Sequence, residues 1–133
     1  MQPMNAKVTR ALPMQCRVET CDNSGAKQLK IFSVTRHKTV KGRVPAAGVG
    51  DLVMASVVSG RPDMRKQVVL AVIVRQRKEY RRPDGTRIKF EDNAAVVVKD
   101  DKGNPKGTIF KGAIAKEATS RWPGVAKLSK IVV

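Results

Sequence analysis

Apolar residues in this chain come in short runs that are separated by turn residues. Runs rich in Val, Ile and Thr between Gly, Pro, Asn or Asp are typical of β-strands. Short links between successive strands predict antiparallel neighbours, and five or six strands in a chain of this size favour a small closed barrel without exposed edges. The expected fold is therefore mainly β, with strands over residues 14–21, 27–35, 51–59, 67–80, 86–91 and 94–99.

Three turn sequences divide these runs. Residues 22–25 (Asp-Asn-Ser-Gly) supply a glycine for positive φ and predict a hairpin between the first two strands. Pro83-Asp84-Gly85 combines a fixed φ at Pro with Gly where a left-handed conformation is needed, so replacing Gly85 with Val is expected to damage folding. Residues 101–104 predict another tight reversal.

The fourth run changes character along its length. Residues 68–74 are apolar throughout, as in a strand buried on both faces. Five of the next eight residues, 75–82, are basic, and the return strand brings Arg87 and Lys89. We interpret residues 75–90 as a β-ribbon that projects beyond the barrel, carries cations on both faces, faces no core and inserts into RNA. The alternative is a solvated hairpin whose charges only aid solubility.

A second basic stretch, residues 36–43, lies in the loop before the strand at 51–59. Gly48 and Gly50 follow it in the chain. They would let the backbone approach a phosphate closely, or they are ordinary turn glycines that lead into the next strand. A G-x-G sequence without a following helix is not a nucleotide-binding fingerprint.

The carboxyl-terminal part, residues 114–133, has a helical pattern. Residues 114–121 contain helix-forming residues with one apolar side, and this helix is expected to end near Pro123, with a second short turn over 125–129. Trp122 is expected to cap the open end of the barrel. The alternative is an anchor for protein docking, since Trp is favoured at binding hot spots.

The charge of the chain indicates its partner. The 133 residues include 27 Lys and Arg against 11 Asp and Glu, a net charge of +16. Such a charge opposes compactness unless a polyanion neutralises it, and each phosphate contact of a nucleic acid releases a counterion. An anionic membrane is the rival partner, but it requires a basic amphipathic helix or an anchor, and we find neither. With three Phe, one Tyr and one Trp, the chain is expected to hold RNA by phosphates and shape rather than by base stacking.

Other chemistries find little support in the sequence. Cys16 and Cys21 form no C-x-x-C and His37 is the one histidine, so two reduced thiols packed as small hydrophobes are expected, with a disulfide or metal site as the alternative. The neighbouring acids at 91–92 and 100–101 lie beside turns, where solvated carboxylates are ordinary. No motif for acid–base or nucleophilic catalysis occurs. We expect no metal, no cofactor, no small-molecule substrate and no enzymatic activity.

The length of the chain and its apolar runs predict one domain over residues 1–133. The longest apolar run has seven residues, whereas a transmembrane helix needs about 20. The first residues lack the apolar block of a signal peptide, so a cytoplasmic location is expected.

The central part of the chain resembles a known family. Its spaced pattern is similar to the signature of universal large-subunit ribosomal protein fourteen at Ala71-Val72-Ile73-Val74, Asp84-Gly85, Phe90, Asn93 and Val96-Val97. Residues 22–26 and 47–51 also resemble that family. The loop 36–46 and the tail from Lys116 to Pro123 resemble its archaeal and eukaryotic branch. The similarity runs from about Met14 to the end, which leaves residues 1–13 as an N-terminal extension.

The resemblance implies a five-stranded barrel with a projecting ribbon and a small helical carboxyl-terminal piece. It also implies a structural constituent of the large ribosomal subunit that binds large-subunit rRNA directly and contributes to intersubunit bridges with small-subunit rRNA. The implied neighbours are universal protein three, protein twenty-four and an anti-association factor of the initiation-factor-six type. A free RNA-binding module or chaperone on an OB-like barrel and a small RNA-processing enzyme are the alternatives.

The candidate binding residues follow from the two basic stretches. Arg can hold a phosphate with two donors, whereas Lys acts as a point charge. The residues expected to bind rRNA are Arg36, Lys38, Lys41, Arg43, Arg75, Arg77, Lys78, Arg81, Arg82, Arg87 and Lys89. The candidate contacts with protein partners are Lys116, Arg121 and Trp122.

Overall fold

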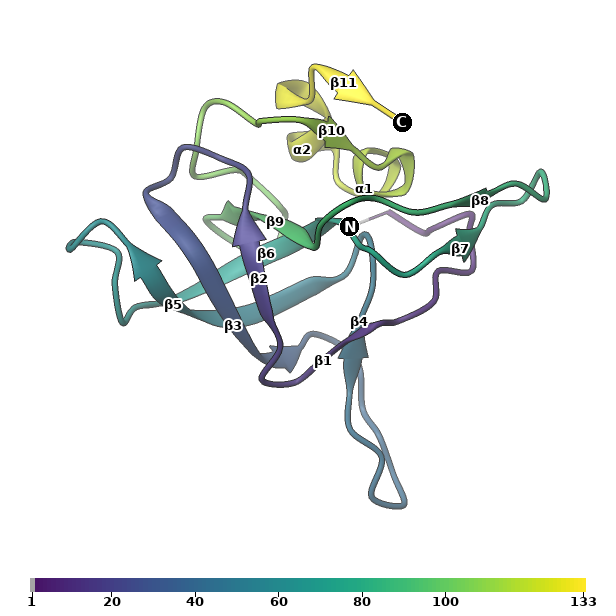
Figure 1. Ribbon diagram of the computed structural model, residues 1–133, viewed down its shortest axis with the longest axis horizontal. Coiled ribbons are helices and arrows are strands. Elements are labelled where there is room, and N and C mark those ends of the chain that lie inside the picture. The colour runs from purple at the N-terminus through teal and green to yellow at the C-terminus, as the bar shows by residue number, and fades with distance from the viewer. Residues whose placement is uncertain (1) are drawn as a thin grey trace.

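A computed structural model describes residues 2–133 of the chain and shows a mainly β fold (Figure 1). The strands are β1 (Leu12–Pro13), β2 (Arg17–Thr20), β3 (Ala26–Val34), β4 (Ala46–Ala47), β5 (Leu52–Gly60), β6 (Val68–Arg75), β7 (Tyr80–Arg81), β8 (Arg87–Ile88), β9 (Ala94–Val98), β10 (Ala113–Ile114) and β11 (Ile131–Val132). The helices are α1 (Lys116–Arg121) and α2 (Pro123–Leu128).

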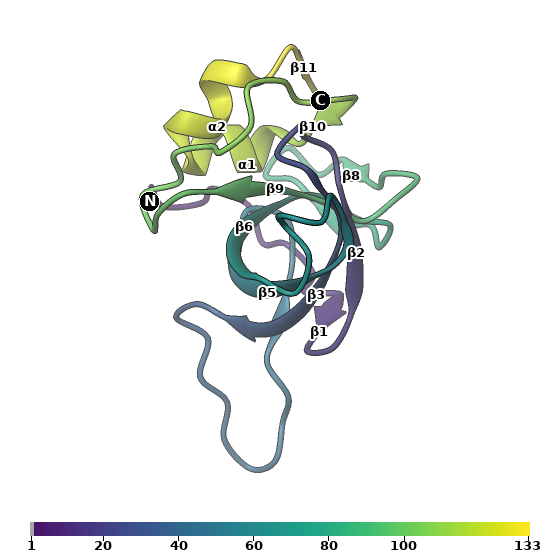
Figure 2. The same ribbon diagram turned by 90° about the vertical axis from the view of Figure 1, so that its left-hand side faces the viewer.

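Five strands form the closed barrel that the sequence predicts, in the order β2-β3-β5-β6-β9. Figure 2 views this barrel nearly end-on. Four pairs are antiparallel, but β2 and β9 close the ring in parallel, with Glu19 opposite Ala94. The expectation of a purely antiparallel barrel is wrong at this pair. Strand directions that alternate around a ring of five must repeat once where the ring closes, so one parallel pair is unavoidable.

Two hydrophobic cores share the walls of the barrel. One fills the interior, with Leu29, Ile31 and Ile73 among its members. The other lies between the outer face of β6 and β9 and the two helices, and it includes Val72 and Trp122. All of β9 and residues 71–74 of β6 are therefore buried, which confirms a strand covered on both faces there. Val68, at the start of β6, is exposed instead.

The ribbon is present but shorter than the sequence indicates, and its base packs against the protein. The strand predicted over 67–80 ends at Arg75, and β7 pairs with β8 over two residues each. Gln76 directly follows β6 and is buried. Its side-chain amide accepts from the Val49 N–H and donates to the carbonyl oxygens of Thr9 and Lys78, which fixes the chain at the base of the ribbon. The expectation that the ribbon faces no core is wrong.

The buried ring of Tyr80 shows why, since it is fully enclosed in the outer core. At the ribbon's tip, Gly85 has a φ of 93°, which confirms the left-handed conformation expected there. The hairpin turn at Gly25, with a φ of 103°, and the reversal at Gly103, with a φ of 87°, are confirmed as well.

The carboxyl-terminal helices are two, and Pro123 begins the second helix rather than lying beyond the first. Proline suits the first position of a helix because the N–H it lacks has no partner there in any case. Residues 113–114 form β10, which pairs in parallel with β11, and the sequence analysis misses both strands. Between residues 2 and 133, no helix has the length and apolar character that crossing a membrane requires.

The N-terminal segment is part of the fold. Pro13 and Leu12 in β1 pair with β4, and Leu12 closes one end of the interior core. The Gln2 N–H donates to the Arg121 carbonyl, and Lys7 bridges to Arg81 in the ribbon. Residues 2–13 therefore hold the ribbon and α1 against the barrel.

Candidate nucleic-acid interface

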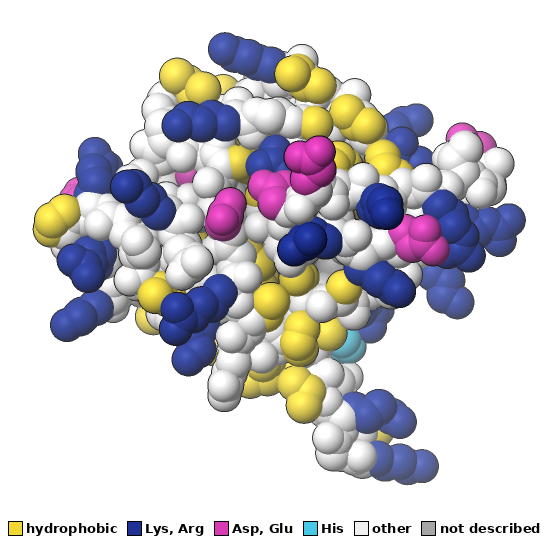
Figure 3. All heavy atoms as spheres, viewed as in Figure 1, with side chains coloured by type: hydrophobic (Ala, Val, Ile, Leu, Met, Phe, Trp, Pro, Cys, Tyr) yellow, Lys and Arg dark blue, Asp and Glu magenta, His cyan; other side chains and the backbone are white. Residues whose placement is uncertain are grey.

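Both basic stretches leave the barrel from the same end. Val34, the last residue of β3, lies opposite Val53 at the start of β5, and the neighbouring Leu52 lies opposite Val72 near the end of β6. The loop 36–45 and the ribbon therefore begin close to each other and then diverge (Figure 1). Figure 3 shows dark-blue cationic side chains at the ribbon and at the tip of the loop.

The loop presents its cations to solvent. Arg36, Lys38, Lys41 and Arg43 are all exposed. Arg36 and Lys41 adopt positive φ values of 62° and 58°, where Gly or Asn would be favoured over other residues. The sequence keeps cations at both positions.

A histidine holds the base of the loop. His37 Nε2 lies 3.0 Å from Arg10 Nη1, and its Nδ1 lies 3.0 Å from the Ala46 carbonyl oxygen. A guanidinium only donates, so Nε2 accepts and Nδ1–H donates to the carbonyl. The ring therefore ties the N-terminal segment to β4, and within residues 2–133 its two hydrogen-bond partners are Arg10 and Ala46 rather than an acid.

The ribbon presents five of its predicted cations to solvent, namely Arg77, Lys78, Arg81, Arg87 and Lys89. Arg87 also forms an ion pair with Glu79 at 3.3 Å, but both side chains are about half exposed. Exposed ion pairs of this kind contribute little to stability, and water readily replaces either partner, so Arg87 stays available to another anion.

Two predicted phosphate ligands are instead engaged inside the protein. Arg75 is 12% exposed and its Nε lies 2.9 Å from Asp92 Oδ1. Its Nη1 also donates to the carbonyl oxygens of Lys111 and Ala113. Its role is to join the end of β6 to the segment before β10. The sequence suggests a phosphate ligand because Asp92, seventeen residues away, is not visibly its partner.

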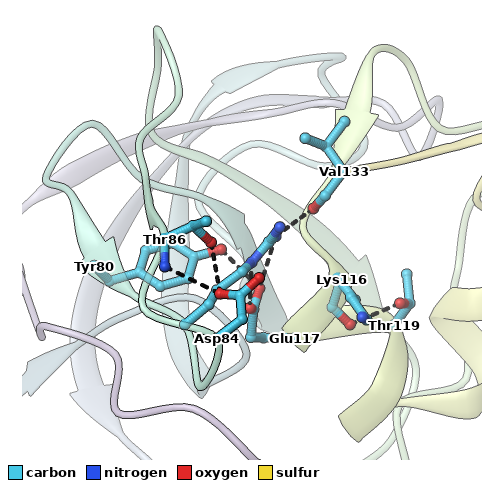
Figure 4. A network of polar contacts seen from close by, with 8 residues as sticks. Tyr80, Asp84, Thr86, Lys116, Glu117, Thr119 and Val133 are labelled. Atoms are coloured by element: carbon cyan, nitrogen blue, oxygen red, sulfur yellow. Dashed lines mark hydrogen bonds and ion pairs between the residues drawn. The ribbon is translucent and has the colours of Figure 1, made fainter.

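Arg82 is the second, and Figure 4 labels three residues of its network, namely Tyr80, Glu117 and Val133. Arg82 Nε lies 2.8 Å from Glu117 Oε1, and the Tyr80 hydroxyl donates to Glu117 Oε2 at 2.7 Å. Arg82 also donates to the Val133 carbonyl oxygen. Burial, followed by the hydrogen bond and charge of Glu117, raises the pKa of Tyr80, which therefore stays a neutral donor. Glu117 neutralises Arg82, which docks the ribbon on α1 rather than facing solvent.

The three candidate partner contacts differ in exposure. Lys116 is exposed, whereas Arg121 is half-buried and pairs with Asp51 at 3.2 Å. Trp122 is fully buried, packs against Gly103 and donates to the Gly50 carbonyl at 2.8 Å. Trp122 is thus a packing residue, which contradicts its assignment as a docking anchor. It covers the outer face of the barrel rather than an open end.

Two cations of this surface are missed by the sequence analysis. Lys7 and Arg10 are exposed and lie beside the ribbon and the loop base through their contacts with Arg81 and His37. Their position in the first dozen residues, outside the resemblance, hides them. Basic character at 7 and 10 is the only signal that the sequence offers.

Metal-binding side chains do not cluster in the part of the chain that the structure describes. Residues 2–133 contain no cluster of three His, Cys, Asp or Glu side chains that could hold a metal ion. Cys16 and Cys21 are free thiols, and burial raises the pKa of Cys21 to about 11. A thiol with such a pKa is a poor nucleophile at neutral pH.

Comparison with known proteins identifies the family of this chain. A sequence model described as ribosomal protein L14p/L23e matches residues 11–133. The chain is 53% identical to the large ribosomal subunit protein uL14 of Nanoarchaeum equitans, over all of both chains. It is 50% identical to that of Methanococcus vannielii and 51% identical to that of Methanococcus maripaludis, over 99% of each chain. The chain therefore belongs to the ribosomal protein L14p/L23e family and is of the archaeal type.

Proposed function

We propose that this protein is a structural constituent of the large ribosomal subunit that binds rRNA through the loop 36–45 and the ribbon. Family membership supports the ribosomal role. The observation that carries the RNA-binding surface is the set of exposed cations that leave one end of a rigid barrel on two diverging projections. The protein acts without catalysis.

Phosphates are the ligands that fit this surface. The cations proposed to bind them are Arg36, Lys38, Lys41, Arg43, Arg77, Lys78, Arg81, Arg87 and Lys89, joined by Lys7 and Arg10. Tyr80, Phe110 and Trp122 are buried and Phe90 is half-buried, so Phe32 on β3 is the one aromatic ring of five that is exposed, which leaves little surface for base stacking. Contacts with the phosphate backbone of RNA position a protein without reading the base sequence, so specificity is expected to follow from the shape of the RNA.

The proposal extends to the partners implied by the resemblance. At the subunit surface, the protein contributes to bridges with small-subunit rRNA and contacts universal protein three and protein twenty-four. An anti-association factor of the initiation-factor-six type docks on it as well. Of the three candidate contacts with protein partners, Lys116 is the one with an exposed side chain.

The test is rRNA binding by a ribbon variant with Arg77→Gln, Lys78→Gln and Arg81→Gln. Arg82 is left intact because its loss would disturb α1. Each phosphate contact contributes about 0.7–0.9 to the slope of log K against log salt, so the variant should flatten that slope by roughly 2–3. Binding of purified large-subunit rRNA is measured across a series of KCl concentrations.

A matched control removes the same charge elsewhere. Lys116, Lys127 and Lys130 are exposed and lie in or beside the helices. Their triple change to Gln should leave the slope nearly unchanged. Equal slopes for the ribbon variant, the control variant and the original chain would contradict the proposed surface.

A further inference from the structure

The end of the barrel opposite the ribbon carries its own group of cations. Six exposed side chains gather there, namely Lys27, Arg61, Arg65, Lys66, Lys106 and Lys111. The strand register brings their segments together, since Ala26 pairs with Gly60 and the Lys106 N–H donates to the Val97 carbonyl. Figure 2 faces this end, and in Figure 1 the turn 61–67 lies at the left while the ribbon lies at the right.

A buried methionine fixes the turn that carries three of these cations. Met64 is 2% exposed and belongs to the interior core, so it closes this end of the barrel. The N–H groups of Met64 and Arg65 both donate to the Arg61 carbonyl, which makes one compact turn. Lys106 Nζ lies 3.2 Å from Met64 Sδ, which places the next segment against the same turn. The cations around Met64 are therefore carried by a compact turn that is fixed to the interior core.

Arg61 is held in place before any ligand arrives. Its Nη2 donates to the Ser24 carbonyl at 3.1 Å, and its guanidinium lies across Gly25, where a Cβ would approach its Nε to 2.4 Å. The side chain nevertheless remains 62% exposed, with further N–H donors free to bind. Its pair with Asp63 is long, at 3.7 Å, and exposed on both sides. An ordered arginine loses less conformational entropy when it binds an anion.

Lys66 is a cation in a backbone conformation that favours other residues. Its φ is 64°, where Gly or Asn is adopted at lower cost. Lys66 shares this feature with Arg36 and Lys41 in the proposed RNA-binding loop. Three of the four non-glycine residues with positive φ among the described residues are therefore cations.

The charge at this end is not balanced by the described acids that line it. Asp22 is buried and accepts from the Val97 N–H at 3.0 Å and from Ser24. The exposed acids here are Glu19 and Asp63, against six cations. A hollow of about 550 Å³ opens at this surface, and Lys27, Arg61 and Lys111 are among the residues that line it.

We propose that this end, which we name the plug face (Lys27, Arg61, Arg65, Lys66, Lys106 and Lys111), binds a second segment of RNA through its phosphates. The inference rests on the proposed function and adds a second contact surface to it. The ribbon and the plug face lie at opposite ends of a rigid barrel, so the protein holds two RNA segments at a fixed separation. An acidic protein segment is the competing occupant, and the experiments below separate the two.

The first experiment compares salt dependence. A plug-face variant carries Arg65→Gln, Lys66→Asn and Lys106→Gln, where Asn tolerates the positive φ of position 66. For binding to purified large-subunit rRNA, the slope of log K against log salt should flatten by roughly 2–3, as expected for the ribbon variant. The control with changes at Lys116, Lys127 and Lys130 should keep its slope. Circular dichroism and urea unfolding confirm that the variant is folded. A folded plug-face variant that behaves like the control would overturn the inference.

The second experiment locates the RNA at each end. Asp63 and Glu79 are acids in exposed ion pairs with arginines, one on the plug face and one on the ribbon. Each is changed to Cys in a Cys16→Ser background, labelled with iron–EDTA and incorporated into large subunits, and hydroxyl-radical cleavage of the rRNA is mapped. We expect position 63 and position 79 to cleave different rRNA segments.

The outcomes distinguish this inference from the proposed function. Cleavage from position 79 with none from position 63 would reject the plug face as an RNA contact and leave the ribbon proposal intact. Cleavage from position 63 alone would support the plug face and contradict the ribbon. Cleavage from neither position would contradict both.

Discussion

At the residue scale, three buried polar side chains hold segments that have little regular structure. Gln76 forms hydrogen bonds with backbone groups of Val49 and Thr9 just after the end of β6. Glu117 binds the ribbon by accepting hydrogen bonds from Tyr80 and Arg82. Asp22, which lies in the turn between β2 and β3, accepts a hydrogen bond from the Val97 N–H of β9. Each of these side chains joins segments more than twenty residues apart, so none of these contacts is visible as a local sequence motif.

Asp22 gives the first prediction at this scale. Changing Asp22 to Ala removes the acceptor of the Val97 N–H and of the Ser24 hydroxyl. Asp22 is only 8% exposed, so water does not readily replace the lost carboxylate. An unsatisfied buried donor costs about 1–3 kcal/mol, so the free energy of unfolding should fall by about that amount. Urea unfolding measures it, with Asp101→Ala, an exposed turn acid, as a control that should change little. Equal stability of the two variants would refute the role of Asp22.

Cys21 gives a prediction that depends on pH. Burial, opposed by the nearby charge of Arg75, raises its pKa to about 11, whereas an unfolded thiol has a pKa of about 8.5. The stability that the neutral thiol contributes is fully present below about pH 8.5 and is lost as the pH rises toward 11. At pH 8, iodoacetamide should alkylate Cys21 much more slowly in the folded protein than in guanidinium chloride, as followed by mass spectrometry. Rapid labelling of folded protein would show that Cys21 is accessible.

At the scale of elements, the ribbon is docked rather than free. Its projecting half carries exposed cations, while its base contributes Tyr80 to the core and Arg82 to Glu117 of α1. The N-terminal segment adds the bridge between Lys7 and Arg81 on the other side. Helix α1 has only six residues, so tertiary contacts of this kind stabilise it more than intrinsic helix propensity does.

Glu117→Gln tests this docking. The variant loses the charge that neutralises Arg82, which is 18% exposed, and one acceptor of its network. We expect the free energy of unfolding to fall by about 2–4 kcal/mol, because removing one partner of a largely buried pair leaves the other uncompensated. Glu79→Gln, which breaks the exposed pair with Arg87, should change stability by less than about 1 kcal/mol. Similar losses in both variants would mean that burial of the Glu117 pair is unimportant.

At the scale of the whole molecule, the barrel acts as a rigid block between charged projections. Its interior and outer cores leave little freedom in the five strands, while cations are displayed on the loop, the ribbon and the plug face. The positive charges that give the net charge of +16 repel one another in the free protein, and the proposed contacts with rRNA phosphates would neutralise them. The assembled state should therefore be strongly favoured at moderate ionic strength.

Sedimentation of a cell lysate tests this expectation. On sucrose gradients, the protein should travel with the large subunit and remain with it at moderate salt, since many phosphate contacts act together. A protein that stays at the top of the gradient at low salt would instead be a free RNA-binding module. Purified small subunits, carried in a parallel gradient, control for nonspecific adsorption of a basic protein.

The sequence by itself determined the mainly β fold, the five strands of the barrel, the left-handed turn at Gly85 and the basic character of the loop and ribbon. These features depend on local patterns: alternating runs, turn residues and charge that can be counted along the chain. The sequence could not separate Arg77 and Arg81, which face solvent, from Arg75 and Arg82, because their partners Asp92 and Glu117 lie far along the chain.

Tertiary structure alone decided which cations remain free and which surface they share. The plug face draws on three segments that only the strand register brings together, so no stretch of sequence shows it. Closure of the ring likewise required the parallel pair of β2 and β9, and packing of the helices buried Trp122. The physical reason is common to all three: a folded chain pairs charges, strands and apolar surfaces by distance in space, whereas sequence patterns report only on neighbours along the chain.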